Sequence, residues 1–327
     1  MFKSPPGPAA WALVQPLAVA TALAIGVSDA RAAFPGMNGR LAFGVETWRL
    51  PDPCLPMPHG CEPEVVSSSV ETVLPSGRAR RVLRAFPVGE GVGESGPAWS
   101  PSGRSLTLQQ GSRLAIVRVD GTGLRQLPQL TNGDAEPTWS PDGRRLAFVG
   151  RTPCCNWLYS VRRDGTALRR VIAQEARWPA WSTTGRIAFV NDNDRSGRTF
   201  GLEDGTYAIR SDGSRLRRLF GRYRGTGQQP DWSPDGRRIA FVARRHIYAA
   251  RADGQRLRRL TGNSGDSDPA WSPDGRYIAF IREHDLYVMR ANGRGLRRLV
   301  DGADQDLDHP DRPWAQISAP SWQPLRR

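Results

Sequence analysis

The chain has 327 residues, of which 39% are hydrophobic and 24% are charged. This balance supports a folded core and excludes collagen-like and intrinsically disordered chains. The formal net charge of +14 predicts a basic surface that attracts anionic partners.

The first 32 residues have the pattern of an export signal. Lys3 precedes an apolar stretch from Ala9 to Val27, which Pro16 interrupts, and Ala30-Arg-Ala32 forms a small-residue cleavage site. Cleavage after Ala32 would leave 295 residues with a net charge of +13 and no stable membrane insertion. The alternative is a retained single-pass anchor, because the stretch approaches the roughly 20 residues that span a bilayer. We therefore predict a signal peptide at 1–32, one domain at 33–327, and an exported protein in the periplasm, the cell envelope or the medium.

From residue 39 onward the chain repeats a tight turn that opens a short apolar strand. The clearest copies are Trp139-Ser-Pro-Asp-Gly-Arg144, Trp232 to Arg237 and Trp271 to Arg276. Proline presets φ, aspartate bonds the local backbone and glycine accepts a left-handed conformation, so each copy predicts a hairpin turn. The turn glycines are Gly39, Gly103, Gly143, Gly185, Gly236 and Gly275.

The repeat tryptophans set the period of the chain. They are spaced 40, 42, 51, 39 and 51 residues apart and are Trp99, Trp139, Trp181, Trp232, Trp271 and Trp322. A period near 40 residues is typical of one four-stranded blade per repeat. The sequence therefore predicts an all-β, six-bladed β-propeller.

Each repeat continues to a second turn and an arginine-rich run. Examples are the turn Asp164-Gly-Thr-Ala167 and the run Leu216 to Leu219, in which two leucines flank two arginines. We expect this run to be the outer strand, with leucines against the sheet and arginines facing water. Each blade is then an inner tryptophan strand, a second strand, a third strand and this outer strand.

The two ends of the repeat predict how the ring closes. The first copy begins at a second strand, Gly39-Arg-Leu-Ala-Phe43, and Pro320-Ser-Trp-Gln-Pro324 is an inner strand with no partner after it. We expect this C-terminal strand to complete the first blade, which would remove the open edges of the array.

The Pro-x-Trp-Ser-Pro-Asp-Gly-Arg pattern resembles the repeat of the TolB-like six-bladed β-propellers over nearly all of residues 34 to 327. The resemblance implies the fold rather than one function, because its members include periplasmic scaffolds, peptidase-associated propellers and some lyases. This chain departs from the pattern at Trp181-Ser-Thr-Thr-Gly185, which lacks the proline and the aspartate.

The four cysteines form two clusters, and an oxidising compartment favours disulfides. We predict a bond between Cys54 and Cys61, because the residues between them are turn-rich and lie in one insertion. Cys154 and Cys155 would then form a strained vicinal bridge or remain thiols. A zinc site from all four is disfavoured, because neither cluster has the usual ligand spacing.

The connections of a four-stranded blade alternate between the two faces of the ring. Both marked turns therefore share one face, which we call the turn face, and the connections of irregular length share the other, which we call the loop face. The irregular segments are 46–65, 86–96, 191–206, 221–229 and 300–318. Variable loops on a rigid scaffold are the usual place for binding, so we expect the binding site on the loop face.

Two groups of residues make up the predicted binding face. The first lies just before the inner-strand proline, near the channel mouth, where carboxylates predict an acidic funnel within a basic outer wall. The second comprises tryptophans outside the repeat position, which could anchor a partner or stack on sugar rings, or else pack beneath the loops. Together with a histidine of the last long loop the predicted residues are Trp48, Glu136, Trp157, Trp178, Gln229, Asp268, His309 and Trp314.

The sequence offers one weak cation site. Asp304, Asp306 and Asp308 alternate in a way that could bind calcium, since hard cations take several oxygen ligands. The glycine and the distal glutamate of the helical calcium loop are missing, so we favour solvated loops and predict no cofactor.

Catalytic patterns are scarce. None of the four histidines has a metal-binding spacing, and there is no Gly-x-Ser-x-Gly elbow. We predict a monomeric, non-enzymatic scaffold that binds a protein or an anionic envelope polymer through its loop face, and not nucleic acid. The alternative is a metal-assisted carbohydrate lyase or hydrolase that acts at the channel mouth.

Overall fold

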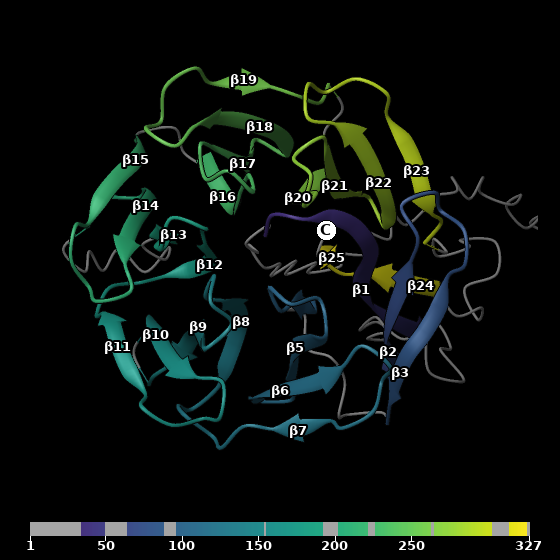
Figure 1. The fold of residues 1–327 in the computed structure, drawn as a ribbon, viewed down its shortest axis with the longest axis horizontal. Helices are drawn as coiled ribbons and strands as arrows, with labels where there is room; N and C mark the ends of the chain where they lie inside the picture. Colours follow the sequence, from purple (N-terminus) through teal and green to yellow (C-terminus); the bar gives the residue numbers. More distant parts are fainter. Residues whose placement is uncertain are drawn as a thin grey trace, which may run out of the picture.

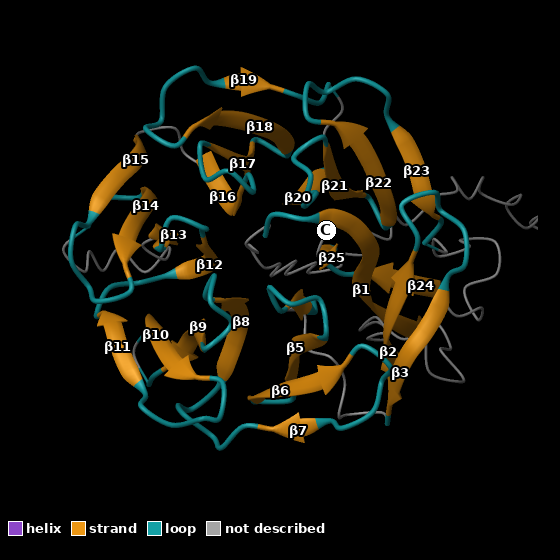
Figure 2. Ribbon diagram, viewed as in Figure 1, coloured by secondary structure: helices purple, strands orange, loops and turns teal. Residues whose placement is uncertain are grey.

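The computed structural model describes residues 34–49, 64–87, 96–153, 155–191, 202–221, 226–262, 265–302 and 314–325. Six antiparallel sheets surround a central axis (Figure 1), and these residues consist of strands, turns and loops (Figure 2). The predicted six-bladed β-propeller is confirmed. Within the same ranges there is no helix with the length and apolar character needed to cross a membrane.

The blades follow one another along the chain, and only the first draws on both ends. Blade 1 contains β1 (Met37–Arg49), β2 (Glu64–Val73), β3 (Arg81–Phe86), β24 (Trp314–Ile317) and β25 (Ser321–Leu325). Blade 2 contains β4 (Ala98–Trp99), β5 (Ser105–Gln110), β6 (Arg113–Arg118) and β7 (Arg125–Gln126). Blade 3 contains β8 (Asp134–Trp139), β9 (Arg145–Arg151), β10 (Asn156–Arg162) and β11 (Arg169–Ile172).

The remaining three blades have the same order from the axis outward. Blade 4 contains β12 (Arg177–Trp181), β13 (Arg186–Asn191), β14 (Gly205–Arg210) and β15 (Arg217–Gly221). Blade 5 contains β16 (Thr226–Trp232), β17 (Arg238–Ala243), β18 (His246–Arg251) and β19 (Arg258–Arg259). Blade 6 contains β20 (Asp266–Trp271), β21 (Tyr277–Arg282), β22 (Asp285–Arg290) and β23 (Arg297–Val300).

The core lies between neighbouring blades. Second strands such as β9 carry continuous apolar runs because each sheet is covered on both faces, and a strand buried on both faces does not alternate. One cluster joins Leu114 and Ile116 of blade 2 to Trp139 and Phe148 of blade 3. Burial of these side chains holds each blade to the next and keeps the ring rigid.

The C-terminal strand closes the ring, as the repeat predicts. β25 pairs with the first part of β1, where Ala42 lies opposite Ser321, and the indole of Trp322 donates to Ala270 O of blade 6 at 3.0 Å. The closure also involves a second strand, β24, in a segment that the repeat pattern predicts to be a loop. β24 pairs with the far part of β1, and its Trp314 lies opposite Trp48.

The residue before each repeat tryptophan alternates around the ring between a polar side chain and alanine. In blade order from the first, these residues are Ser321, Ala98, Thr138, Ala180, Asp231 and Ala270. Each polar side chain accepts the main-chain N–H of the next blade's tryptophan, whereas each alanine carbonyl accepts the next tryptophan's indole N–H. The polar links are Ser321 Oγ to Trp99 N at 3.2 Å, Thr138 Oγ1 to Trp181 N at 3.3 Å and Asp231 Oδ2 to Trp271 N at 2.6 Å. The carbonyl links are Ala98 to Trp139 at 3.1 Å, Ala180 to Trp232 at 3.1 Å and Ala270 to Trp322 at 3.0 Å.

Arginines of the outer strands make hydrogen bonds to neighbouring blades. The guanidinium of Arg125 donates to Arg163 O at 2.7 Å, and that of Arg169 donates to Asp212 O at 2.6 Å. In both cases the acceptor lies in the second turn of the next blade, beside the start of the outer strand. These exposed arginines therefore connect neighbouring blades at the rim.

Candidate functional site

Four of the predicted binding residues occupy equivalent places where the inner strands begin, at the loop-face end of the channel. Each precedes a proline within a β-bulge and has a left-handed backbone: φ is 55° at Glu136, 52° at Trp178, 52° at Gln229 and 59° at Asp268. This conformation costs a residue with a Cβ about 1–2 kcal/mol. Bulges accommodate the proline, which has no N–H to give to the ladder.

The bulge brings a side chain of one blade to the main chain of the next. The Glu136 carboxylate accepts the N–H of Trp178, and Gln229 Oε1 accepts the N–H of Asp268 at 3.1 Å. The four side chains are buried, with 3%, 5%, 6% and 6% of their surface exposed in chain order. The four side chains therefore offer little surface to a ligand, and two of them make hydrogen bonds that connect neighbouring blades.

Trp178 lies in the core between blades 4 and 5. It shares a hydrophobic cluster with Ala180 and Phe241. Its indole Nε1 is buried and has no hydrogen-bond partner in the part of the chain that the structure describes. Trp178 thus packs as a core residue even though Trp181 already fills the repeat position of the same blade.

Burial dominates the electrostatics of the channel carboxylates. It raises the pKa of Glu136 to about 7, although the N–H of Trp178 and the charges of Arg177 and Arg151 act in the opposite direction. Burial also raises the pKa of Asp134, which accepts hydrogen bonds from the Thr131 hydroxyl at 2.7 Å and from the Leu130 N–H at 3.0 Å. The buried carboxyl of Glu136 therefore releases its proton at a higher pH than an exposed glutamate does.

Arginines offset the carboxylates that we expected to make the channel mouth acidic. Arg282 holds the fully buried Asp266 with two hydrogen bonds, Nε to Oδ1 at 2.6 Å and Nη2 to Oδ2 at 3.2 Å. Its guanidinium also lies 5.2 Å from the ring centroid of Tyr287. Arg177 Nε lies 3.7 Å from Glu175 Oε1. Two of the acidic side chains near the mouth, Asp266 and Glu175, are therefore paired with arginines.

The described ranges contain no group of three histidine, cysteine, aspartate or glutamate side chains that could bind a metal ion. Several predicted residues lie outside those ranges, namely Asp304, Asp306, Asp308, His309, Cys54, Cys61 and Cys154. Cys155 lies within them and is buried.

Trp157 stands at the loop-face end of β10. It is half-buried, and the guanidinium of Arg170 from β11 lies 4.8 Å from its ring centroid. Such stacking adds a cation–π attraction to the packing of the ring. The pair gives blade 3 an aromatic and cationic surface at its loop-face end.

Blade 1 extends farther toward the loop face than blade 3 does. Leu146 of β9 and Leu41 of β1 both lie opposite a repeat tryptophan, so the two strands can be compared from these residues. Beyond them, β9 ends at Arg151 and β1 ends at Arg49, which makes β1 three residues longer in this direction. At roughly 3.3 Å per residue the extra length is about 10 Å. We call β24 together with 45–49 of β1 and 64–67 of β2 the blade-1 projection. An ion pair of 3.1 Å between Arg49 and Glu64 lies at its tip.

One edge of the blade-1 projection has no strand beside it. β3 pairs with β2 only as far as Ser68, which lies opposite Phe86. Within the described ranges no strand pairs with the outer edge of 64–67. Trp48 lies in the middle strand and is half-buried, and its buried indole Nε1 has no hydrogen-bond partner among the described residues. Trp48 and Trp314 are both predicted binding residues, and only the pairing of β1 with β24 shows that they lie opposite each other.

Comparisons with known proteins agree with this architecture. A family model for the dipeptidyl peptidase IV (DPP IV) N-terminal region matches residues 261–309, which include blade 6. No curated protein has a significant match to the chain.

Solved structures share the fold at low sequence identity. TolB from Acinetobacter baumannii has 17% identity and a TM-score of 0.65 over 88% of this chain and 67% of that chain. A chain of a nidogen/laminin complex has 10% identity and a TM-score of 0.64 over 88% of this chain and 100% of its own length. An oligogalacturonate lyase in complex with manganese has 15% identity and a TM-score of 0.53 over 77% and 82%. The fold is thus a TolB-like six-bladed β-propeller, and at these identities the likeness concerns the fold alone.

Proposed function

We propose that this protein is an exported, non-enzymatic scaffold that binds a protein of the cell envelope through its loop face, with the blade-1 projection as the main contact. The observation that carries the proposal is the extension of β24, β1 and β2 beyond the loop face, with Trp48 and Trp314 opposite each other. A rigid ring that presents one raised, aromatic-bearing sheet suits recognition rather than turnover.

The open edge of β2 supports a protein partner. A strand edge presents unpaired main-chain N–H and C=O groups, which a second extended chain can pair with by adding a strand. On the segment 64–67, Val65 and Val66 are half-buried and lie between the exposed Glu64 and Ser67. Main-chain bonds would then supply affinity while the valines and Trp48 select apolar side chains.

Trp48 has the chemistry of an interface anchor. Tryptophan contributes a large apolar surface together with one N–H donor, and such residues carry much of the binding energy of protein interfaces. Trp48 is half-buried and its indole N–H is itself buried, so a bound partner would contact the exposed part of the ring. Arg49 and Glu64 at the tip would form a polar rim around this anchor.

Two of the similar solved structures also support a protein partner. The fold occurs in TolB and in a chain of a nidogen/laminin complex, where a propeller is part of a protein–protein assembly. The signal pattern at 1–32 supports export.

The test is a photo-crosslinker placed at Ser67 of the full chain, expressed in its own cell envelope. We expect one dominant crosslinked protein, whose yield falls at least tenfold in Trp48→Ala and recovers in Trp48→Phe. The matched control is Tyr277→Ala, because Tyr277 is an exposed aromatic at the turn-face end of β21. Equal yields in wild type and Trp48→Ala would contradict the proposal. Turnover of an acidic oligosaccharide that a chelator abolishes would instead support the lyase alternative.

A further inference from the structure

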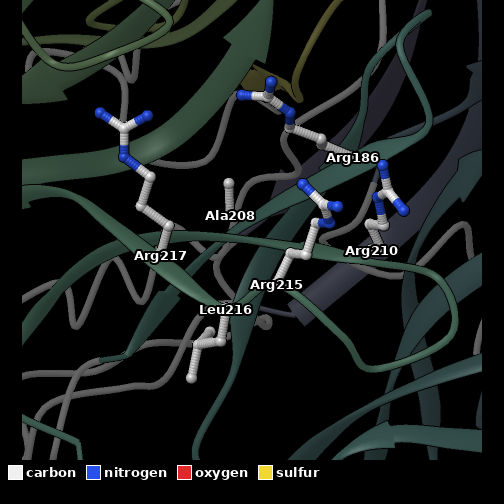
Figure 3. A pocket seen from close by; sticks show the side chains of 6 residues that line it. All are labelled: Arg186, Ala208, Arg210, Arg215, Leu216 and Arg217. Atoms are coloured by element: carbon white, nitrogen blue, oxygen red, sulfur yellow. The ribbon is translucent and has the colours of Figure 1, made fainter.

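A basic hollow lies at the turn face of blade 4, on the opposite side of the ring from the blade-1 projection. It has a volume of about 440 Å³ and is lined by Arg186, Ala208, Arg210, Arg215, Leu216 and Arg217. Figure 3 shows three of the guanidinium groups on one side of Ala208 and that of Arg217 on the other. The lining contains four cations and no carboxylate.

Blades 1 and 3 show how an arginine at this position can be held by neighbouring groups. In blade 3, Arg145 begins the second strand and donates from Nε to Ser160 Oγ at 2.8 Å and from Nη2 to Ala167 O at 3.1 Å. In blade 1, Arg40 donates in the same way to Thr72 Oγ1 at 2.9 Å and also to Ala79 O. A hydroxyl on the third strand thus holds the arginine against the sheet.

Blade 4 lacks these compensating groups. Arg186 is the equivalent arginine, because Ile187 lies opposite Trp181 as Leu146 lies opposite Trp139. Ala208 stands where blade 3 has Ser160, so the hydroxyl acceptor is gone. Arg186 is exposed, and its main-chain N–H donates to Ser182 Oγ at 3.1 Å, whereas its guanidinium makes no hydrogen bond to the part of the chain that the structure describes.

The shortened turn of blade 4 removes a negative charge as well. In blade 3 the turn aspartate Asp142 bonds Ser140 Oγ at 2.6 Å and acts electrostatically on Arg145. In blade 4 its place is taken by Thr184, whose hydroxyl lies 2.8 Å from Ser182 Oγ. The departure from the repeat pattern therefore leaves Arg186 without the nearby carboxylate.

The other arginines of the hollow add charge that is only partly balanced. Arg215 stands where blade 3 has Ala167, with a left-handed φ of 56°. Arg217 is held in place by its bond to Asp253 O at 3.1 Å, which neutralises no charge. Asp212 lies in the second turn of the same blade, and its pKa is lowered first by its hydrogen bonds from Ser214 and to a smaller extent by the charge of Arg210.

We infer that this hollow is a binding site for a phosphate- or sulfate-type oxyanion, free or carried on a larger anionic molecule. Guanidinium groups match such oxyanions with paired N–H donors, and convergent arginines are attracted to multiply charged groups. The volume falls within the range of small-molecule sites, so the hollow accommodates a group larger than one phosphate, such as a diphosphate. The inference is independent of the proposed partner on the loop face.

Calorimetric titration of the full chain with inorganic diphosphate tests the site. We expect saturable binding to one site, weakened at least tenfold in Arg186→Ala. The matched control is Arg238→Ala, because Arg238 begins the second strand of blade 5 but its guanidinium lies 4.5 Å from the ring centroid of Trp271. An equal loss in both variants would show a general effect of net charge and would overturn the inference.

A second variant keeps all four arginines. Ala208→Ser restores the hydroxyl that holds the equivalent arginine in blades 1 and 3, and it leaves the net charge unchanged. We expect Ala208→Ser with Thr184→Asp to weaken diphosphate binding at least tenfold, and Ala208→Ser alone to weaken it measurably. Unchanged affinity in the double variant would overturn the inference.

The source of the anion is resolved by competition. Phosphatidylglycerol vesicles that bind the wild-type chain and are displaced by diphosphate would support the site with a lipid headgroup as its ligand. Diphosphate binding without vesicle binding would support the site with a soluble anion. Vesicle binding that is equal in wild type and Arg186→Ala, with no diphosphate binding, would overturn it.

Discussion

The carboxylate of Glu136 accepts a hydrogen bond from the main-chain N–H of Trp178 and so connects the inner strands of blades 3 and 4. Gln229 makes the same connection to Asp268 between blades 5 and 6, with a neutral amide oxygen. The link therefore requires an acceptor and not a charge. Burying a carboxylate in this position has a cost that burying an amide does not have.

That difference predicts a dependence of stability on pH. Burial raises the pKa of Glu136 to about 7 from an ordinary value of 4.5, so the folded chain binds this proton more tightly than the unfolded chain does. The stability that comes from this tighter proton binding is fully present below about pH 4.5 and is lost as the pH rises through about 7. Relative to wild type, Glu136→Gln should gain up to about 3 kcal/mol in the free energy of unfolding between pH 5 and pH 8. Urea denaturation of the wild type and of Glu136→Gln at several pH values measures this difference in the free energy of unfolding.

The reverse substitution is the control. Gln229→Glu should introduce a similar loss of stability with rising pH between blades 5 and 6, because Gln229 is equally enclosed. Parallel curves of stability against pH for wild type and Glu136→Gln would contradict the assignment of a raised pKa to Glu136.

The ion pair of Asp266 and Arg282 predicts a large loss of stability when only one partner is removed. Asp266→Asn would leave the guanidinium of Arg282, whose side chain is 11% exposed, without its counter-charge. Breaking a buried pair in this way costs about 3–5 kcal/mol. Chemical denaturation measures the change. The control is Glu64→Gln in the exposed pair with Arg49, where we expect a change of about 1 kcal/mol or less.

The alternating links between tryptophans predict unequal effects for two buried threonines. Thr138→Val removes the acceptor of the Trp181 N–H and should destabilise the chain by about 1–3 kcal/mol, because a buried donor is left unpaired. Thr107→Val is the matched control, since the buried Thr107 hydroxyl has no partner among the described residues. We expect that substitution to be neutral or stabilising. Equal losses in the two variants, followed by thermal melting, would show that the Thr138 bond has no special role.

Closure of the ring predicts the effect of truncation. Ending the chain after Ala319 removes β25 and with it the bond from the Trp322 indole to Ala270 O. Blade 1 would lose its inner strand and blade 6 would lose its cover, so we expect cooperative thermal unfolding to disappear. Removal of residues 326 and 327 alone serves as the control. A truncated chain that melts at the wild-type temperature would mean that β25 does not close the ring.

Much of the fold could be predicted because its signals are local. The Pro-Asp-Gly turns, the period near 40 residues and the unpartnered strand around Trp322 indicated six blades and their closure. The site was predicted less completely. Their place in the repeat predicts Glu136 and Gln229 near the channel mouth, but it does not show that each side chain accepts a main-chain N–H of the next blade, about 40 residues away in sequence. The signal peptide and the Cys54 to Cys61 disulfide stay predictions, and so does the expectation that Asp304, Asp306 and Asp308 lie in solvated loops rather than at a cation site.

Local turn chemistry and spacing were enough to indicate the number of blades, the order of their strands and the two faces of the ring. Contacts between blades and between strands could come only from the tertiary structure, because they depend on which side chains the ring brings together. The alternation of Thr138 with Ala98 is explained only by the tryptophan of the next blade, which donates its main-chain N–H to Thr138 but its indole N–H to the carbonyl of Ala98. In the same way, the sequence shows only that Thr184 departs from the turn pattern. The tertiary structure shows in addition that Ala208 lines the same hollow as Arg186, so that no hydroxyl is available there to accept a bond from the guanidinium.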